Sequence, residues 1–243
     1  MERPTLIIFA SGTKDEGSSS TTPLGFSKTG YRQENLGGGS GFENLATSKE
    51  LDADIVAVVS NHEHGGVRAR AERLGIPFVY FNEKQHSNIL QNVGMLYQQV
   101  VKETGADYVA LSGWMRHVSG LDPARTINIH PALLSFDHGR FGGNGMYGHH
   151  VHEAVKQALD AGEITESGFS MHFVTEKLDR GPIIFEGRVP LTPEMTADDI
   201  AAAVNKAEHE WQPKITNMVV HGEIRWDGKN FTTLVIPAEY RRP

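Results

Sequence analysis

Residues 127–131 read Ile-Asn-Ile-His-Pro, and this stretch sets the first expectation for the fold. Side chains of a strand alternate between its two faces, so Asn128 and His130 would share one face while Ile127 and Ile129 occupy the other. The proline that follows favours a loop directly after the strand. Polar side chains at the end of such a strand are typical of α/β proteins, which keep their sites at strand ends.

A carboxylate follows about fifty residues later, in Leu-Asp-Arg-Gly-Pro at 178–182. The amide of Asn128 can donate to a developing oxyanion, the imidazole of His130 can donate or move a proton, and Asp179 can accept one. The set contains no Ser or Cys nucleophile, which favours direct transfer between two bound substrates. The alternative is structural, because a buried His is often a core residue and Asp before Arg-Gly-Pro is often a turn former.

Composition narrows the class of protein. The 243 residues predict one domain, and 39% hydrophobic with 22% charged residues is ordinary for a soluble globular protein. The formal net charge of -7 argues against broad nucleic-acid binding. The sequence has no cysteine, which excludes disulfides, thiolate catalysis and Cys-based metal sites. The first apolar run is too short for a signal peptide or a membrane span, so we expect a cytoplasmic protein.

Hydrophobic patterning predicts the elements. Short apolar runs indicate buried strands at 5–10, 55–60, 77–81, 108–111 and 126–130. Helical spacing is found at 42–46, 66–74, 86–104, 151–161 and 197–220. Alternating strands follow at 168–175 and 183–189, and Asp227-Gly228 indicates a hairpin within 223–236. Strands that alternate with helices predict a mostly parallel sheet, and the later strands make it mixed.

Three further motifs each allow two interpretations. The glycine run at 37–41 before a helix could cradle a phosphate or be a flexible linker, and it is not a Walker loop. The histidines at 149, 150 and 152 suggest a metal at first, but the helical spacing after them favours an anion site that includes His150. Trp114 and Met115 could line a pocket for a flat ring, or be a core aromatic beside the surface residue Arg116.

Taken in order, these motifs resemble the phosphoribosylglycinamide formyltransferase family of folate-dependent enzymes. The segments that carry the resemblance are 39–41, 111–116, 127–134, 150–155, 172–182 and 208–209. The resemblance implies an α/β, single-domain Rossmann-like fold over residues 1–222, with a mostly parallel sheet, antiparallel additions and helices on both faces. Residues 13–36 would then be a loop insertion, and 223–243 a C-terminal hairpin or tail.

The resemblance also implies a reaction, which is transfer of a formyl group from 10-formyltetrahydrofolate to the amine of glycinamide ribonucleotide in purine biosynthesis. It involves no metal, nucleic acid or membrane. The implied catalytic residues are Asn128, His130 and Asp179. The implied substrate-binding residues are Gly39, Ser40, Gly41, Glu208 and His150. The folate side would consist of Trp114, Met115, Arg116, Val174, Thr175 and Glu176, with 174–179 closing over the pterin.

The chain departs from the family pattern in several places. Gly41, Ala132 and Ser135 replace the usual Asn, Ser and Pro, and the glycine-rich stretch 139–148 lengthens the approach to His150. The polar insertion at 13–36 contains Lys28 and Arg32. It could be a lid that supplies charge to a phosphate, or an inert surface loop.

Two rival functions stay open. One is formyl transfer to another amine, such as methionyl-tRNA or an amino sugar nucleotide; the acidic balance argues against the tRNA enzymes, which carry a basic C-terminal domain. The other is a non-catalytic folate-binding homologue, against which the intact Asn128, His130 and Asp179 speak. For an active enzyme we expect an acid-side loss of rate, as a His-like group of pKa about 6.5 or a raised carboxylate at Asp179 is protonated.

Overall fold

The computed structural model describes residues 2–12, 37–82 and 93–241. The proposed lid and its Lys28 and Arg32 lie outside the described residues, as do positions 86–92 of the helix expected at 86–104. The chain divides into two compact units. The first comprises residues 1–48 and 53–114, and the second comprises residues 49–52 and 115–243.

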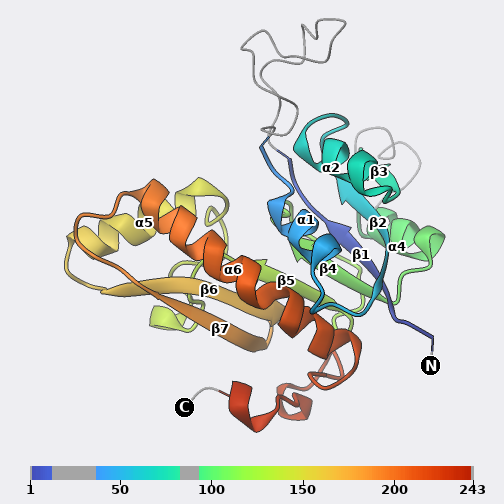
Figure 1. The fold of residues 1–243 in the computed structure, drawn as a ribbon. Helices are drawn as coiled ribbons and strands as arrows, with labels where there is room; N and C mark the ends of the chain where they lie inside the picture. The colour runs from blue at the N-terminus through green and yellow to red at the C-terminus, as the bar shows by residue number, and fades with distance from the viewer. Residues whose placement is uncertain (1, 13–36, 83–92, 242–243) are drawn as a thin grey trace, which may run out of the picture. The chain divides into compact units, whose positions relative to one another are not determined.

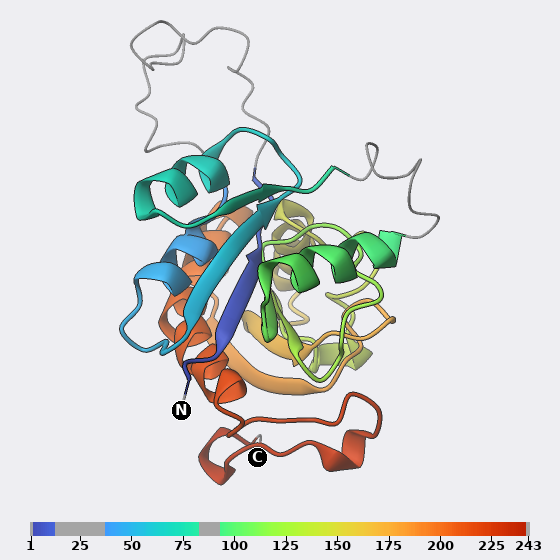
Figure 2. The same cartoon turned by 90° about the vertical axis from the view of Figure 1, so that its right-hand side faces the viewer.

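The first unit is built on four parallel strands in the order β3-β2-β1-β4. The strands are β1 (Thr5–Phe9), β2 (Asp54–Ser60), β3 (Phe78–Tyr80) and β4 (Tyr108–Ser112). The helices are α1 (Ser40–Thr47), α2 (Gly66–Leu74) and α4 (Val93–Thr104). Right-handed crossovers place α4 on the face of these strands opposite α1, as Figure 2 shows. Because both faces are covered, β1 is apolar from Leu6 to Phe9 rather than alternating, and these four residues are fully buried.

The second unit contains two antiparallel strand pairs in the order β5-β6-β7. The strands are β5 (Thr126–His130), β6 (Glu166–Phe173) and β7 (Ile183–Pro190), and the helices are α5 (His149–Asp160) and α6 (Ala197–Val220). Helix α6 lies along the strands and beside α5 (Figure 1). The register pairs Asn128 with His172 and His130 with Ser170. Two polar positions of β5 therefore face two polar positions of β6.

The predicted fold class, a mixed α/β protein with a mostly parallel arrangement and antiparallel additions, is confirmed. Several element ends differ from expectation. Helix α5 begins at His149 rather than Val151, directly after Gly148 with φ 56°. Strand β6 ends at Phe173 rather than Thr175. Among the described residues, no helix has the length and apolar character needed to cross a membrane.

The predicted C-terminal hairpin is wrong in extent. Within residues 223–241, one isolated antiparallel bridge is found, between Arg225 and Val235. The Asp227 carboxylate instead accepts hydrogen bonds from the amides of Lys229 and Asn230, both at 2.8 Å, and a 3-10 turn follows at Phe231–Thr233. Local side-chain bonds of this kind compete with a strand ladder. The segment is held by aromatic packing as well, with the Trp226 ring 5.7 Å from that of Phe173.

Helix α6 begins with a reciprocal cap. The Thr196 hydroxyl accepts from the Asp199 amide at 3.1 Å, and the Asp199 carboxylate accepts from the Thr196 amide at 2.9 Å. We expect Thr196→Ala to lower the free energy of unfolding by about 1 kcal/mol, because the Asp199 amide loses its acceptor and the Asp199 carboxylate loses the hydroxyl that donates to it. Urea unfolding followed by circular dichroism measures it. Thr196→Ser keeps the hydroxyl and should unfold like the wild type; equal losses in both variants would contradict the capping argument.

Candidate active site

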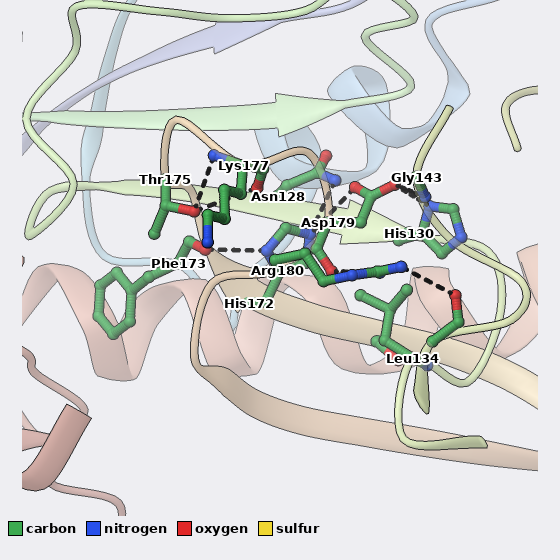
Figure 3. A network of polar contacts seen from close by, with 12 residues as sticks. Asn128, His130, Leu134, Gly143, His172, Phe173, Thr175, Lys177, Asp179 and Arg180 are labelled. Carbon is green, nitrogen blue, oxygen red and sulfur yellow. Dashed lines mark hydrogen bonds and ion pairs between the residues drawn. The ribbon is translucent and has the colours of Figure 1, made fainter. Parts of the chain in front are cut away.

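The three predicted catalytic residues converge within the second unit. Strand β5 positions Asn128 and His130 on one face, and the loop between β6 and β7 brings Asp179 to them (Figure 3). Asp179 has a φ of 52°, in the left-handed region that Asp tolerates better than most residues. The juxtaposition expected from the sequence is therefore present, although each residue's catalytic role stays a prediction.

His130 is held by both of its ring nitrogens. Its Nε2 lies 2.7 Å from the carbonyl oxygen of Phe141, to which it donates because a carbonyl can only accept. Its Nδ1 lies 3.7 Å from Oδ2 of Asp179. Burial lowers the pKa of His130, although the charge of Asp179 and the Phe141 carbonyl oppose this. At neutral pH the imidazole is therefore neutral, with its proton on Nε2.

Asp179 is buried but stays ionised. Burial raises the pKa of Asp179, but contact with His172, the charge of His130 and the Gly143 amide outweigh it and hold the pKa below its usual value. The Gly143 amide donates to Oδ2 at 2.8 Å, and Oδ1 lies 3.6 Å from Nε2 of His172. The expectation of a raised carboxylate at this position is therefore wrong. Hydrogen bonding and neighbouring imidazoles, which the sequence pattern does not reveal, decide the direction.

His172 is a site residue that the sequence analysis missed. Its Nδ1 lies 2.8 Å from the Phe173 carbonyl oxygen, to which it donates because a carbonyl can only accept. The side-chain nitrogen of Asn128 lies 3.1 Å from Nε2 of His172, the ring atom that also lies 3.6 Å from Oδ1 of Asp179. The signal was present in the sequence. On a strand with Phe169, Met171 and Phe173 facing one way, His172 must face the other, with Asn128 opposite once the register is known.

The predicted folate-side residues fall into two groups. Met115 and Arg116 are exposed. The segment that follows them, 117–120, contacts Glu176 twice: His117 contacts its main-chain carbonyl, and the Gly120 amide donates to its carboxylate. Val174 and Thr175, which lead into Glu176, are partly buried. Trp114 belongs to the first unit, where its indole donates to the Tyr97 hydroxyl at 3.1 Å and packs edge-on against the Phe9 ring. Its ring is 8% exposed, so it is mainly a core residue.

The predicted phosphate glycines lie in the first unit, at the start of α1. Gly39 has a φ of 84°, and a Cβ there would lie 3.0 Å from a Val67 methyl, so both the backbone and the space require glycine. Ser40 and Gly41 are the first residues of the helix, and no side chain caps it. The Arg70 side chain holds the residues that precede α1 by donating to the Gly38 carbonyl at 2.8 Å. Helix N-termini of this kind attract anions.

The remaining predicted residues lie in the second unit. Glu208 is partly buried on α6, and this burial raises its pKa to about 7, opposed only by a hydrogen bond from Asn205. His150 is exposed on α5 and contacts Glu153 at 3.2 Å. His152 is buried, which lowers its pKa to about 4. Within the described ranges, no group of three or more His, Cys, Asp or Glu side chains is arranged to hold a metal ion.

The raised pKa of Glu208 predicts a pH-dependent stability. The folded state binds this proton more tightly than the unfolded chain, whose carboxyl titrates near 4.5. The stabilisation is thus complete below about pH 4.5 and is lost as the pH rises through about 7. We expect urea midpoints of the wild type to fall more between pH 5 and 8 than those of Glu208→Gln. Glu210→Gln, an exposed neighbour, should follow the wild type; identical pH slopes in all three proteins would refute the assignment.

Comparison with known proteins places the chain in a family. The formyl transferase family model matches residues 37–216. The chloroplastic phosphoribosylglycinamide formyltransferase of Arabidopsis thaliana is 31% identical over 78% of this chain and 65% of that protein. The phosphoribosylglycinamide formyltransferase of Bacillus subtilis is 28% identical over 76% of this chain and 91% of that protein.

A solved structure extends the comparison. The crystal structure of phosphoribosylglycinamide formyltransferase from Brucella melitensis is 30% identical, with a TM-score of 0.65, and the match covers 90% of this chain and 96% of that one. The chain spans less than two thirds of the length of the first curated relatives that it matches. The family model covers most of the chain and includes the segments that hold Asn128, His130 and Asp179. The chain therefore belongs to the formyl transferase family.

Proposed function

We propose that this protein transfers the formyl group of 10-formyltetrahydrofolate to the amine of glycinamide ribonucleotide, a step of purine biosynthesis. The observation that carries the proposal is the convergence of Asn128, His130 and Asp179 in a buried polar site. The names of the relatives from Arabidopsis thaliana and Bacillus subtilis support the choice of acceptor. The sequence predicts a cytoplasmic location. One relative is a chloroplastic plant protein, so we keep the cytoplasmic location as part of the proposal.

Bond formation begins when the neutral amine nitrogen attacks the formyl carbon and the carbonyl oxygen takes the electron pair. Asn128 has two amide hydrogens, and only one is directed at His172, so the other can donate to the oxyanion. Nδ1 of His130 and Oδ2 of Asp179 face each other as two acceptors, 3.7 Å apart. The amine proton enters between them, and the imidazolium so formed stabilises the negative charge of the intermediate.

Collapse of the tetrahedral intermediate completes the transfer. The oxygen returns its electron pair, the bond between the formyl carbon and the folate nitrogen breaks, and that nitrogen receives the proton held by His130 and Asp179. The enzyme returns to its starting protonation state, so no outside acid or oxidant is needed. Holding both substrates in this geometry makes the reaction effectively unimolecular, which supplies much of the rate.

We assign substrate contacts as part of the same proposal. The start of α1, with Gly39, Ser40 and Gly41, would receive the ribonucleotide phosphate, and Glu208 and His150 would contact the rest of that substrate. The folate would lie against Met115, Arg116 and the segment 174–176, and Trp114 stays a predicted residue of the folate side. We propose residues 1–222 as the catalytic domain and 223–243 as its C-terminal extension.

The test is an acceptor panel. Purified protein is incubated with 10-formyltetrahydrofolate and, separately, glycinamide ribonucleotide, an amino sugar nucleotide or methionyl-tRNA, while product folate is followed by absorbance. We expect turnover with glycinamide ribonucleotide alone. Turnover only with another amine would replace the acceptor. Folate binding by calorimetry without turnover on any acceptor would identify a non-catalytic homologue.

A further inference from the structure

A segment of five residues in the loop that follows β5, Gly139 to Gly143, forms what we call the glycine turn. Its main chain contacts two catalytic residues at once. The Phe141 carbonyl accepts from Nε2 of His130 at 2.7 Å, and the Gly143 amide donates to Oδ2 of Asp179 at 2.8 Å. One short segment thus touches both sides of the pair that receives the proton.

The contact at His130 selects a tautomer. A carbonyl oxygen only accepts, so the neutral ring must carry its proton on Nε2. The bare Nδ1 is thereby left facing Asp179. With the opposite tautomer, Nδ1 would donate toward the carboxylate and could no longer accept a proton. The Phe141 carbonyl therefore decides whether His130 can act as an acceptor.

The contact at Asp179 fixes the carboxylate. Oδ2 accepts from Gly143 while it lies 3.7 Å from Nδ1 of His130, so the amide holds the oxygen that faces the imidazole. Phe141 and Gly143 are two residues apart in one turn. Their spacing therefore sets the relative placement of the two acceptors, with no additional side chain between them.

The turn itself is tightly enclosed. A Cβ at Gly142 would lie 2.3 Å from a Leu134 methyl and 3.2 Å from Cβ of Asp179, so an alanine at this position requires the Leu134 side chain or the turn itself to move. The Gly142 amide donates to the Gly139 carbonyl at 3.0 Å, which closes the turn. The Arg180 side chain supports the turn by donating to the Gly139 carbonyl at 3.4 Å.

We propose that the glycine turn is the positioning element of this active site. Through its main chain alone, it places the proton of His130 on Nε2 and orients the Asp179 carboxylate, and Gly142 is the residue that permits the close approach. The catalytic consequence rests on the proposed formyl transfer, whereas the tautomer is a property of the protein without substrate.

The first measurement reads the tautomer directly. In uniformly ¹⁵N-labelled protein, the two ring nitrogens of His130, identified by their absence in His130→Ala, differ in shift according to which one carries the proton. We expect the proton on Nε2 in the wild type. In Gly142→Ala the added methyl displaces the turn, so we expect a mixture of both tautomers.

The second measurement is kinetic. Because substrate contacts are not altered, Gly142→Ala should lower kcat by at least about tenfold while both KM values stay within about twofold. Gly145→Ala is the matched control, since it lies in the same glycine-rich stretch at φ 84° and its Cβ meets nothing within 4 Å. Its positive φ adds a backbone strain that Gly142→Ala does not have, but its added methyl meets no neighbour, so it should keep both the tautomer and kcat close to the wild type.

A second variant covers the case in which Gly142→Ala does not fold. Arg180→Ala removes this support of the turn without adding an atom, and should shift the tautomer and kcat in the same direction by a smaller factor. A wild-type proton on Nδ1, or an Nε2 proton and kcat unchanged in the variants, would overturn the proposal. Absence of formyl transfer by the wild type, with the tautomer shift intact, would instead remove the proposed function and leave the positioning element standing.

Discussion

Asp179→Asn is expected to lower turnover at least about a hundredfold, the range for loss of a general base. The carboxylate lies 3.7 Å from His130 and 3.6 Å from His172, and its negative charge is what allows a proton to be held between it and the imidazole. An amide has the same shape and no charge. Asn also tolerates the left-handed backbone at this position, whereas Ala would add strain unrelated to the chemistry.

Steady-state kinetics with glycinamide ribonucleotide and 10-formyltetrahydrofolate measures this effect. Asp137→Asn is the matched control, because Asp137 is an exposed aspartate of the same unit that also has a positive φ, of 40°. It should retain wild-type turnover. A turnover of Asp179→Asn close to the wild type would remove Asp179 from the proposed mechanism.

His130→Ala is the second large effect, and we again expect a loss of at least about a hundredfold in kcat. The substitution removes the proton acceptor Nδ1 and the positive charge that forms beside the oxyanion. His221→Ala is a suitable control, since the His221 ring also contacts a main-chain carbonyl, that of Asp52 at 3.0 Å, outside the site. His221→Ala should lower the stability of the protein, but its kcat should fall far less than that of His130→Ala.

The double variant sharpens the test. If His130 and Asp179 hold one proton between them, the pair with both substitutions should be no slower than the slower single variant, because residues that act as a unit are not additive. Losses that multiply would mean that the two residues act in separate steps. Circular dichroism and urea unfolding confirm that each variant is folded before its rate is interpreted.

The sequence predicts the scaffold of the site better than its electrostatics. Alternation in 127–130 correctly places Asn128 and His130 on one face, because a strand leaves only two directions for a side chain. Of the two groups expected to cause the acid-side loss, the raised carboxylate at Asp179 is contradicted, since the pKa of Asp179 depends on His172 and Gly143, which meet Asp179 only in the fold. His172 itself was overlooked, as its importance comes from the cross-strand register.

The glycine-rich stretch is a second case in which the sequence did not predict the contacts of the site. In the sequence, 139–148 is only a lengthened approach to His150, because composition does not reveal which carbonyl or amide a turn presents. The extent of the predicted C-terminal hairpin was wrong for a local reason. The Asp227 carboxylate accepts from the amides of Lys229 and Asn230, which a hairpin would have paired. Patterns of apolar residues predict the helices and strands. Which partner a main-chain carbonyl or amide contacts is decided only when the chain is packed.

The antiparallel pairing of Asn128 with His172 has a consequence for how such sites diversify. The ladder between β5 and β6 holds these two groups opposite each other, so changes of loop length leave them in place. Asp179 is carried by the β6–β7 connection and is therefore free to move when that connection is exchanged. If the β6–β7 connection is replaced by that of a relative, we expect Asn128 and His172 to stay opposite each other, whereas the position of the carboxylate changes. The site thus consists of one half fixed by the β5–β6 ladder and one half fixed by a loop, so the carboxylate can be repositioned without a change in the sheet.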